Sequence, residues 1–519
     1  MAVATPAKTS GIRDHVRDVA VCFIIPPSPF LADERVFPFI GPLKVAAELR
    51  DNGNHVEVLD LSGYANYEDI VREYCRSTDI TTFGITATTP QLANAVLVKR
   101  AIKKLISGAR IILGGPHVTM THTAYEMDKL VNRERRGTHA WRQLTELFDR
   151  LVVGDGELAV YHAIDSRDKR QVIDAGNIKS PLFLERGTLD DYPPPARDLI
   201  DLVSYKYEID GQPAFSVIAQ LGCPFQCGFC GGRDSHAFRV ARTRSTWNVV
   251  GEIESVIGHQ PAADSRRLSA VMFYDDELNV TKNGLEDLCI GLITLQDRLG
   301  LDMRFRGFVK AELFTQEQAD LMYRAGFRVL LSGVESGSNQ ILNAMRKNTS
   351  REINARCMEY AHNAGMKFKA LMSLGHPGES QATIDESIEW VLTNRPDEVD
   401  WTVITQYPGS PYYDHSEREG DHWVYVEPGG REKLYSANPD FLKDAWFYKG
   451  VPGDYTSFVW TDYLGADQLV HLRDQAERVA QEELGLPEIQ SVAARQFEHS
   501  MAMGLPGNIL RSTVDAHEH

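Results

Sequence analysis

The sequence predicts an α/β protein built from a doubly wound parallel sheet, a partial (β/α)6 barrel and a mainly helical C-terminal region. Three observations lead to this prediction. Short apolar runs alternate with amphipathic stretches over residues 1–165, a pattern typical of a parallel sheet covered by helices. A second alternating series occupies residues 206–415. Residues 416–519 contain aromatic and Gly/Pro-rich loops followed by one long helical pattern.

The composition excludes several classes of protein. The 519 residues carry 55 Lys and Arg against 72 Asp and Glu, a net charge of −17, and so lack the basic footprint of a nucleic-acid-binding protein. No apolar run approaches the ~20 residues that span a bilayer, and no secretory signal opens the sequence. We therefore expect a cytoplasmic protein that contacts neither membrane nor nucleic acid.

The first segment is predicted to form five parallel strands. These strands are Val19–Ile25, Val56–Leu59, Phe83–Thr86, Ile111–Leu113 and Leu151–Val153. Glycines follow the last two strands, as Gly114-Gly115 and Gly154. Ligands of open parallel sheets bind beyond the carboxyl ends of the strands, but glycine is also the ordinary residue of a tight turn. The positions of the glycines alone do not distinguish a ligand-binding edge from ordinary tight turns.

Residues 166–205 are predicted to be a linker, because they are rich in charge and end in a run of prolines. The barrel strands that follow are Ser216–Leu221, Ala270–Tyr274, Arg304–Val309, Val329–Val334, Lys367–Leu374 and Val399–Gln406. A closed eight-fold barrel takes ~250 residues, so this shorter series predicts a barrel that is open on one side. We expect the C-terminal region, with a helix at Ala466–Leu484, to close that side and shape a substrate pocket.

Three of the seven cysteines lie within eight residues, at Cys223, Cys227 and Cys230. An odd and sparse set of cysteines argues against a disulfide framework, whereas clustered thiolates suit zinc or iron–sulfur centres. No fourth cysteine is near, so a four-iron cluster held here would keep one iron open to another ligand. The alternative is a Cys3His zinc site completed by His236. Structural zinc sites usually pair two short ligand spacings, and this loop has one.

The spacing Cys223-x3-Cys227-x2-Cys230, with Phe229 before the last cysteine, resembles the signature of the radical S-adenosylmethionine (SAM) enzymes. The resemblance implies a 4Fe-4S cluster on the three cysteines and SAM on its open iron. It continues at the ends of the barrel strands, where the family binds the methionine amino group, the ribose hydroxyls and the adenine. The residues that match these SAM-binding positions are Phe229, Asp275, Asp276, Glu277, Lys310, Glu335, Ser336, Gly375, Tyr407 and Pro408. Lys310 departs from the family pattern, in which many relatives carry an arginine.

Residues 1–165 resemble the cobalamin-binding domain that precedes the barrel in one large subgroup of these enzymes. The resemblance implies cobalamin contacts at Thr86, Thr88, Gly114, Gly115, His117, Gly154 and Glu157. The sequence lacks Asp-x-His-x-x-Gly, the motif with which other cobalamin enzymes supply a lower axial histidine. The lower cobalt ligand therefore stays open, and we expect His117 to hydrogen-bond to a nucleotide tail or to backbone.

The combined resemblance implies methylation of a carbon centre in a small molecule, by way of a 5′-deoxyadenosyl radical and methylcobalamin. Such an enzyme needs an external electron donor such as flavodoxin or ferredoxin. One alternative is a radical SAM cyclisation, rearrangement or oxidation without methyl transfer, with or without cobalamin. Another is a non-catalytic sensor that uses cluster and cobalamin to register redox state or light. The sequence assigns neither a substrate nor a catalytic side chain.

Overall fold

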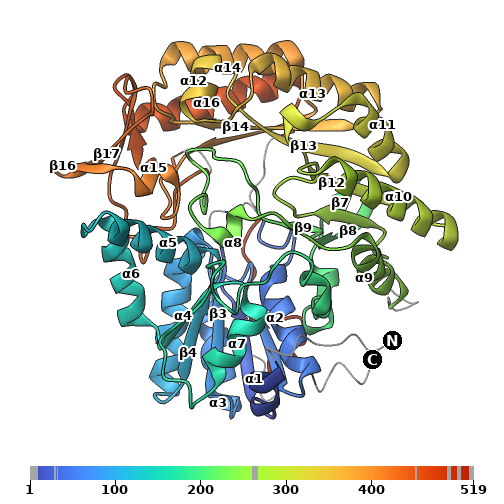
Figure 1. The fold of residues 1–519 in the computed structure, drawn as a ribbon, viewed down its shortest axis with the longest axis vertical. Coiled ribbons are helices and arrows are strands. Elements are labelled where there is room, and N and C mark those ends of the chain that lie inside the picture. The colour runs from blue at the N-terminus through green and yellow to red at the C-terminus, as the bar shows by residue number, and fades with distance from the viewer. Residues whose placement is uncertain are drawn as a thin grey trace.

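The computed structural model describes residues 10–28, 31, 33–259, 267–450, 453–487, 492–498 and 504–513. Its α/β fold contains two seven-stranded sheets, one below the other in Figure 1. The fold class is as the sequence predicts, but each sheet has more strands than the five and six expected. In the part of the chain described, no helix is long and apolar enough to cross a membrane.

The first sheet is doubly wound. Its strands are β1 (Ala20–Ile25), β2 (His55–Asp60), β3 (Thr82–Thr86), β4 (Arg110–Gly114), β5 (Arg150–Gly154), β6 (Val172–Ala175) and β20 (Leu510–Ser512). They lie in the order β20-β2-β1-β3-β4-β5-β6, and all neighbours are parallel except β2 and β20. The strand order reverses between β1 and β3, which is where ligands of open α/β sheets bind.

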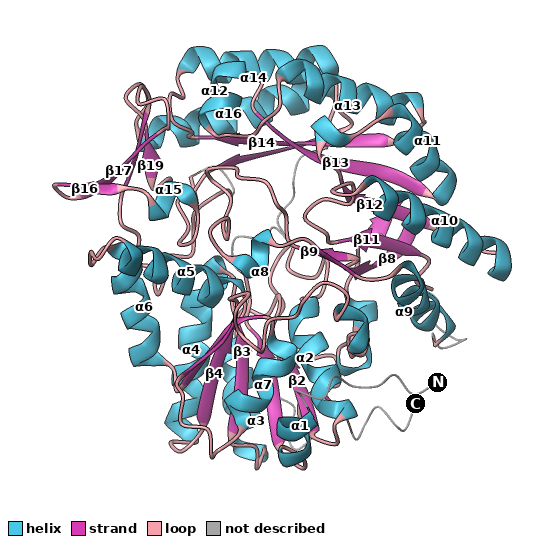
Figure 2. Ribbon diagram, viewed as in Figure 1, coloured by secondary structure: helices cyan, strands magenta, loops and turns pink. Residues whose placement is uncertain are grey.

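Helices cover both faces of this sheet (Figure 2). They are α2 (Ile40–Asp51), α3 (Tyr67–Ser77), α4 (Leu92–Leu105), α5 (Pro116–Leu130), α6 (Arg136–Leu147) and α7 (Gly156–Ile164). Alternate residues of β1 enter two different cores, one with α3, α4 and α6 and the other with α2 and α7. Burial on both faces explains why this strand is a continuous apolar run in the sequence.

The second sheet forms the partial barrel. Its parallel strands are β8 (Gln212–Val217), β11 (Ala270–Phe273), β12 (Arg304–Phe308), β13 (Phe327–Glu335), β14 (Lys367–Leu374) and β15 (Glu398–Val403). The outer helices are α9 (Thr246–Gly258), α10 (Lys282–Leu299), α11 (Gln316–Ala325), α12 (Asn339–Ala344), α13 (Arg351–Asn363) and α14 (Gln381–Asn394). β15 ends one edge and β7 (Glu208–Ile209) the other, so the barrel is open, as predicted.

The first barrel strand begins and ends four residues before the predicted Ser216–Leu221. β8 ends at Val217, and β9 (Gln220–Leu221) leaves the sheet to pair antiparallel with β10 (Arg242–Thr243). The resulting β9–β10 pair frames the loop that carries the three clustered cysteines. That loop and the short helix α8 (His236–Arg239) lie between the two large sheets in Figure 1.

The C-terminal region contains α16 (Ala466–Leu484), which packs beside β15 and α14. It also contains a small antiparallel sheet that the sequence does not predict. The strands of this small sheet are β16 (Glu417–Glu419), β17 (His422–Val426), β18 (Lys433–Ser436) and β19 (Val459–Trp460). Two strands of the first sheet also lie outside residues 1–165, namely β6 in the predicted linker and β20 near the end of the chain.

Candidate functional site

Residues 222–235, here called the cluster loop, hold the three clustered cysteines at the end of β9. Cys227 is buried and Cys223 and Cys230 are partly buried, and all three are free thiols. The backbone N–H of Gly228 donates to the carbonyl of Met345 at 2.8 Å. This hydrogen bond places the cluster loop at the carboxyl-terminal end of the barrel, where barrels of parallel strands have their active sites.

Arg233 organises the cluster loop from within. Its guanidinium is buried and donates to the carbonyl oxygens of Cys223 at 2.6 Å, Phe225 at 3.4 Å and Phe238 at 3.3 Å. A rigid guanidinium satisfies several carbonyls at fixed angles, which a lysine cannot do. Sequence reasoning did not identify this residue, because its partners are backbone atoms.

The donor chemistry of the loop fits an iron–sulfur cluster. Burial raises the pKa of Cys223, and it raises that of Cys230 to about 12, while the positive charge of Arg233 acts in the opposite direction on both. Neighbouring cations favour thiolates, the form that binds metals. Within the described ranges, however, no three His, Cys, Asp or Glu side chains already form a metal site, and His236 is exposed. Ligation by the three cysteines stays a prediction.

Three carboxyl groups follow β11: Asp275 is buried, Glu277 is partly buried and Asp276 is exposed. Asp275 Oδ2 accepts the backbone N–H of Ala219 at 3.1 Å. Its Oδ1 and Glu277 Oε2 are buried without a hydrogen-bond partner among the described residues, and burial raises the pKa of both side chains to about 7. Unpartnered buried acceptors are costly. This segment therefore fits a cationic donor such as the ammonium group of SAM.

Lys310 is buried at the end of β12. Its ammonium lies 2.7 Å from Glu312 Oε1, donates to the carbonyl of Lys347 at 3.2 Å and stands 4.8 Å from the ring centroid of Phe225. The lysine found here in place of the family's arginine is thus paired and lies against the cluster loop.

Glu335 ends β13 at a bulge, where its φ is +64°. A left-handed conformation at a non-glycine residue costs about 1–3 kcal/mol and persists only where its surroundings impose it. Its Oε1 lies 3.1 Å from Lys347 Nζ, and its Oε2 accepts the hydroxyl of Ser373 at 2.8 Å. A Cβ on Gly333 would lie 2.4 Å from Glu335 Oε1. Glycine at 333 therefore makes room for the Glu335–Lys347 pair.

Hydrogen bonds or packing within the protein account for the positions of Ser336, Gly375 and Pro408. The Ser336 hydroxyl lies 3.1 Å from that of Ser387 and accepts the N–H of Ser338 at 3.1 Å. Gly375 has a φ of +94°, and a Cβ there would lie 3.0 Å from Val459 Cγ2. Pro408 is buried. Contact between these residues and SAM stays a prediction.

Tyr407 follows β15 and packs toward the first sheet. Its ring lies 6.3 Å from that of Phe441 and 6.1 Å from that of Phe447, centroid to centroid. Phe229, in contrast, packs against the barrel core, with its ring centroid 5.2 Å from that of His376. The structure therefore places these two predicted SAM contacts in different surroundings.

The predicted cobalamin residues line the carboxyl edge of the first sheet. Gly115 has a φ of +97°, and a Cβ there would lie 2.8 Å from Thr86 Oγ1. Thr88 caps the 3₁₀ turn Thr89–Gln91. At the end of β1 the Ser28 hydroxyl is buried without a hydrogen-bond partner among the described residues. A buried orphan hydroxyl beside the point where strand order reverses fits a polar ligand at this edge.

His117 lies in α5 and is buried. Its Nδ1 is 3.0 Å from Thr89 Oγ1 and its Nε2 is 3.2 Å from Thr121 Oγ1, while burial lowers its pKa to about 3. Both ring nitrogens thus have partners within the protein, which favours the hydrogen-bonding role over cobalt ligation.

The segment after β5 joins the first sheet to the β9–β10 pair. Glu157 is paired with Lys44 of α2 at 2.5 Å. Asp155 forms an ion pair with Arg242, which is 1% exposed and also donates to the carbonyls of Leu184 and Ala237. The N–H of Gly154 donates to Thr119 Oγ1 at 2.9 Å. Much of this segment therefore serves packing and domain contact.

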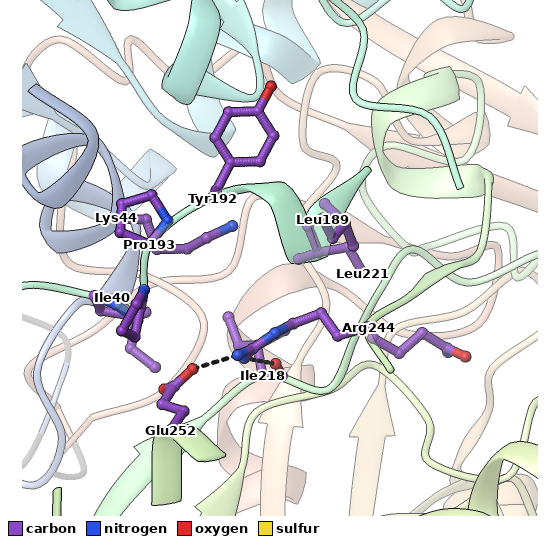
Figure 3. Close-up of a pocket in the computed structure, with 12 residues that line it drawn as sticks. Ile40, Lys44, Leu189, Tyr192, Pro193, Ile218, Leu221, Arg244 and Glu252 are labelled. Atoms are coloured by element: carbon purple, nitrogen blue, oxygen red, sulfur yellow. Dashed lines mark hydrogen bonds and ion pairs between the residues drawn. The ribbon is translucent and has the colours of Figure 1, made fainter. Parts of the chain in front are cut away.

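A pocket lies where α2, the linker prolines and the end of β8 meet (Figure 3). Arg244 and Glu252 are ion-paired at 2.6 Å on its wall. None of the predicted site residues lines it, so we assign it to domain packing.

Comparison with known proteins agrees with this geometry. Residues 217–391 match the sequence model of the Radical SAM superfamily. The chain is 24% identical over 413 residues to an uncharacterized methyltransferase of Pyrococcus horikoshii, over 76% of this chain and 83% of that protein. It is 23% identical over 377 residues to the anaerobic magnesium-protoporphyrin IX monomethyl ester cyclase of Rubrivivax gelatinosus, over 70% of this chain and 63% of that protein.

Among solved structures, the fold resembles that of the radical SAM methyltransferase TsrM from Kitasatospora setae, which was solved with cobalamin and a 4Fe-4S cluster bound. The TM-score is 0.55 at 15% identity, over 80% of this chain and 82% of that chain. Residues 217–391 are thus identified as a radical SAM domain, in a chain whose overall fold resembles that of TsrM.

Proposed function

We propose that this chain is a cobalamin-dependent radical SAM enzyme that methylates a carbon of a small molecule. The observation that carries the proposal is the contact between the cluster loop and α5, the helix that follows Gly114-Gly115. A Cβ on Gly231 would lie 2.5 Å from Met120 Sδ of α5, and one on Gly409 would lie 2.9 Å from the Met120 carbonyl. The two predicted cofactor sites therefore adjoin one another.

The residues divide into three groups in this proposal. Cys223, Cys227 and Cys230 hold the cluster, and the carboxyl groups after β11 accept the SAM ammonium. Glu335 accepts the ribose hydroxyls. Thr86, Thr88, Gly114, Gly115 and Gly154 border the cobalamin edge. When bound, these cofactors would supply a 5′-deoxyadenosyl radical and a transferable methyl group, while the barrel excludes water.

The experiment uses anaerobically reconstituted protein with SAM, hydroxocobalamin and a chemical reductant. We expect about four irons per chain, bound cobalamin in the absorption spectrum, and both 5′-deoxyadenosine and S-adenosylhomocysteine as products. The triple Cys→Ala variant at positions 223, 227 and 230 should lose the iron and both products. Cys289→Ala, in α10 and away from the loop, serves as the matched control. Iron retained by the triple variant would overturn the assignment.

A second candidate is a radical SAM cyclase or oxidase without methyl transfer, which similarity to the ester cyclase favours. It predicts 5′-deoxyadenosine without S-adenosylhomocysteine in the same assay. A reduced cluster that leaves SAM intact would instead indicate a sensor. In the cell, either enzyme requires an external donor such as flavodoxin or ferredoxin, so we expect one of these to replace the chemical reductant.

A further inference from the structure

A chain of side-chain contacts crosses the barrel from β13 to the cluster loop. Lys347 Nζ lies 3.1 Å from Glu335 Oε1, and Glu335 Oε2 is 2.8 Å from Ser373 Oγ. The same hydroxyl is 2.8 Å from His376 Nε2, and His376 Nδ1 is 3.4 Å from the Tyr412 hydroxyl. Five side chains from separate parts of the barrel are thus joined in series.

The donors and acceptors in this series can be assigned in one way. Glu335, ion-paired with Lys347, offers only acceptor oxygens, so the single proton of the Ser373 hydroxyl points to Glu335. Ser373 must then accept from His376 Nε2–H. In a neutral imidazole the other nitrogen is an acceptor, so His376 Nδ1 receives the Tyr412 O–H. Burial keeps His376 neutral, lowering its pKa to about 4.

The far end of the series contacts the cluster loop directly. The backbone N–H of Tyr412 donates to the Gly228 carbonyl at 2.9 Å. The His376 ring meets the ring of Phe229 edge to face, at 5.2 Å between centroids. Gly228 and Phe229 lie between Cys227 and Cys230, two of the predicted cluster ligands. The series of side chains therefore ends in contact with the segment between these ligands.

Water has little access to the Ser373, His376 and Tyr412 end of this series. His376 and Tyr412 are 0% exposed, and Ser373 is 6% exposed. Hydrogen-bond networks in a buried environment are strong and rigid when every member is satisfied. The strained backbone at Glu335 is the kind of conformation that such a network can hold in place.

We propose that Ser373 and His376 are positioning residues that fix the Glu335 carboxylate relative to the cluster loop. SAM must contact both the cluster and the Glu335 carboxylate that binds its ribose. The distance between the cluster loop and this carboxylate therefore determines the affinity for SAM. The inference rests on the proposed function and adds to it two residues that do not themselves touch the cofactor.

The test compares steady-state cleavage of SAM by reconstituted holoenzymes. Ser373→Ala removes the donor to Glu335, and we expect KM for SAM to rise about tenfold or more with kcat close to that of the wild type. His376→Leu should act in the same way. His376→Gln keeps an N–H donor near Nε2 and should restore much of the affinity.

Ser332→Ala is the matched control, because Ser332 is equally buried on β13 but hydrogen-bonds toward Cys357. It should leave KM unchanged. Equal KM values for Ser373→Ala and Ser332→Ala, or equal losses for His376→Gln and His376→Leu, would overturn the inference. Calorimetric binding of SAM to the cluster-loaded proteins tests it without turnover, and Ser373→Ala should bind about tenfold more weakly. Failure of the wild type to cleave SAM, by contrast, overturns the proposed function.

Discussion

The ring of Tyr412 fills the space that any side chain on Gly228 would need. A Cβ added at Gly228 would lie 2.3 Å from Tyr412 Cε1, and the two residues are also joined through their backbones at 2.9 Å. The middle of the cluster loop therefore requires a glycine because of close approach by another segment.

Gly228→Ala should destabilise the protein and its cluster, because the methyl group must displace a fully buried ring. Overpacking of this kind costs about 1–3 kcal/mol, so we expect a lower Tm and a lower iron content after reconstitution. Gly251→Ala in α9 is the control, because a Cβ there meets nothing within 4 Å and alanine favours a helix by about 0.5–1 kcal/mol. Wild-type Tm and iron content in Gly228→Ala would contradict the expected clash.

Arg233→Lys should loosen the cluster loop while preserving its charge. A lysine cannot serve all three carbonyl oxygens that the guanidinium bonds, and each buried acceptor left unpaired costs about 1–3 kcal/mol. We expect slower cluster assembly and faster loss of iron to a chelator. Arg239→Lys, exposed on α8, should behave as the wild type. Equal rates of iron loss in the two variants would show that the bonds of Arg233 do not hold the loop.

Acid should destabilise the protein partly through its buried histidines. Unfolded His117 takes up a proton near its ordinary pKa of 6.5, whereas the folded residue does so only near 3. The unfolded state thus binds more protons between these values, so stability falls as pH falls, by up to about 1.4 kcal/mol per pH unit. His376, with a pKa of about 4, adds to the same slope.

His117→Gln tests this contribution. Its Tm should be lower than that of the wild type near neutral pH, but it should decline less steeply between about pH 6.5 and pH 5. His236→Gln, at an exposed position, should keep the wild-type slope. Parallel curves for His117→Gln and the wild type would rule out His117 as a source of the acid sensitivity.

Asp155→Asn should weaken the contact between the first sheet and the β9–β10 pair. Arg242 is 1% exposed, so loss of its counter-charge leaves a buried cation, which typically costs about 3–5 kcal/mol. Asp302→Asn is the comparison, because the Asp302 side chain is 75% exposed in its pair with Arg304 and exposed pairs contribute about 1 kcal/mol or less. Thermal unfolding should separate the two variants clearly, and a similar small change in both would contradict a buried interdomain pair.

The long strands and helices were predictable, because each packs against a hydrophobic core and this burial requires a regular spacing of apolar residues in its sequence. β14, at Lys367–Leu374, agrees with its predicted range end for end. β6 and β20 were not predicted, because strands of three or four residues take their structure from the neighbouring strand rather than from their own sequence. The antiparallel strands β16–β19 likewise form only by pairing with one another.

The candidate site was predictable where residues are adjacent in sequence and not where they meet in space. The three cysteines are recognisable from spacing alone. Lys347 was missed, and the partners of His376 and Arg242 were not predicted, because nothing in the local sequence indicates which residues they contact. Ser336 shows the opposite case, since it matches a family position although its hydroxyl is bonded to Ser387.

The pairing of β20 with β2 has a consequence for biosynthesis. Until Leu510–Ser512 leaves the ribosome, β2 is an unpaired edge strand, and the entire barrel has already been made. Exposed edges invite pairing with other chains, and proteins of this size fold domain by domain from the N-terminus. We infer that the first sheet is completed only after the barrel has been made, and that truncation before residue 510 leaves an aggregation-prone edge.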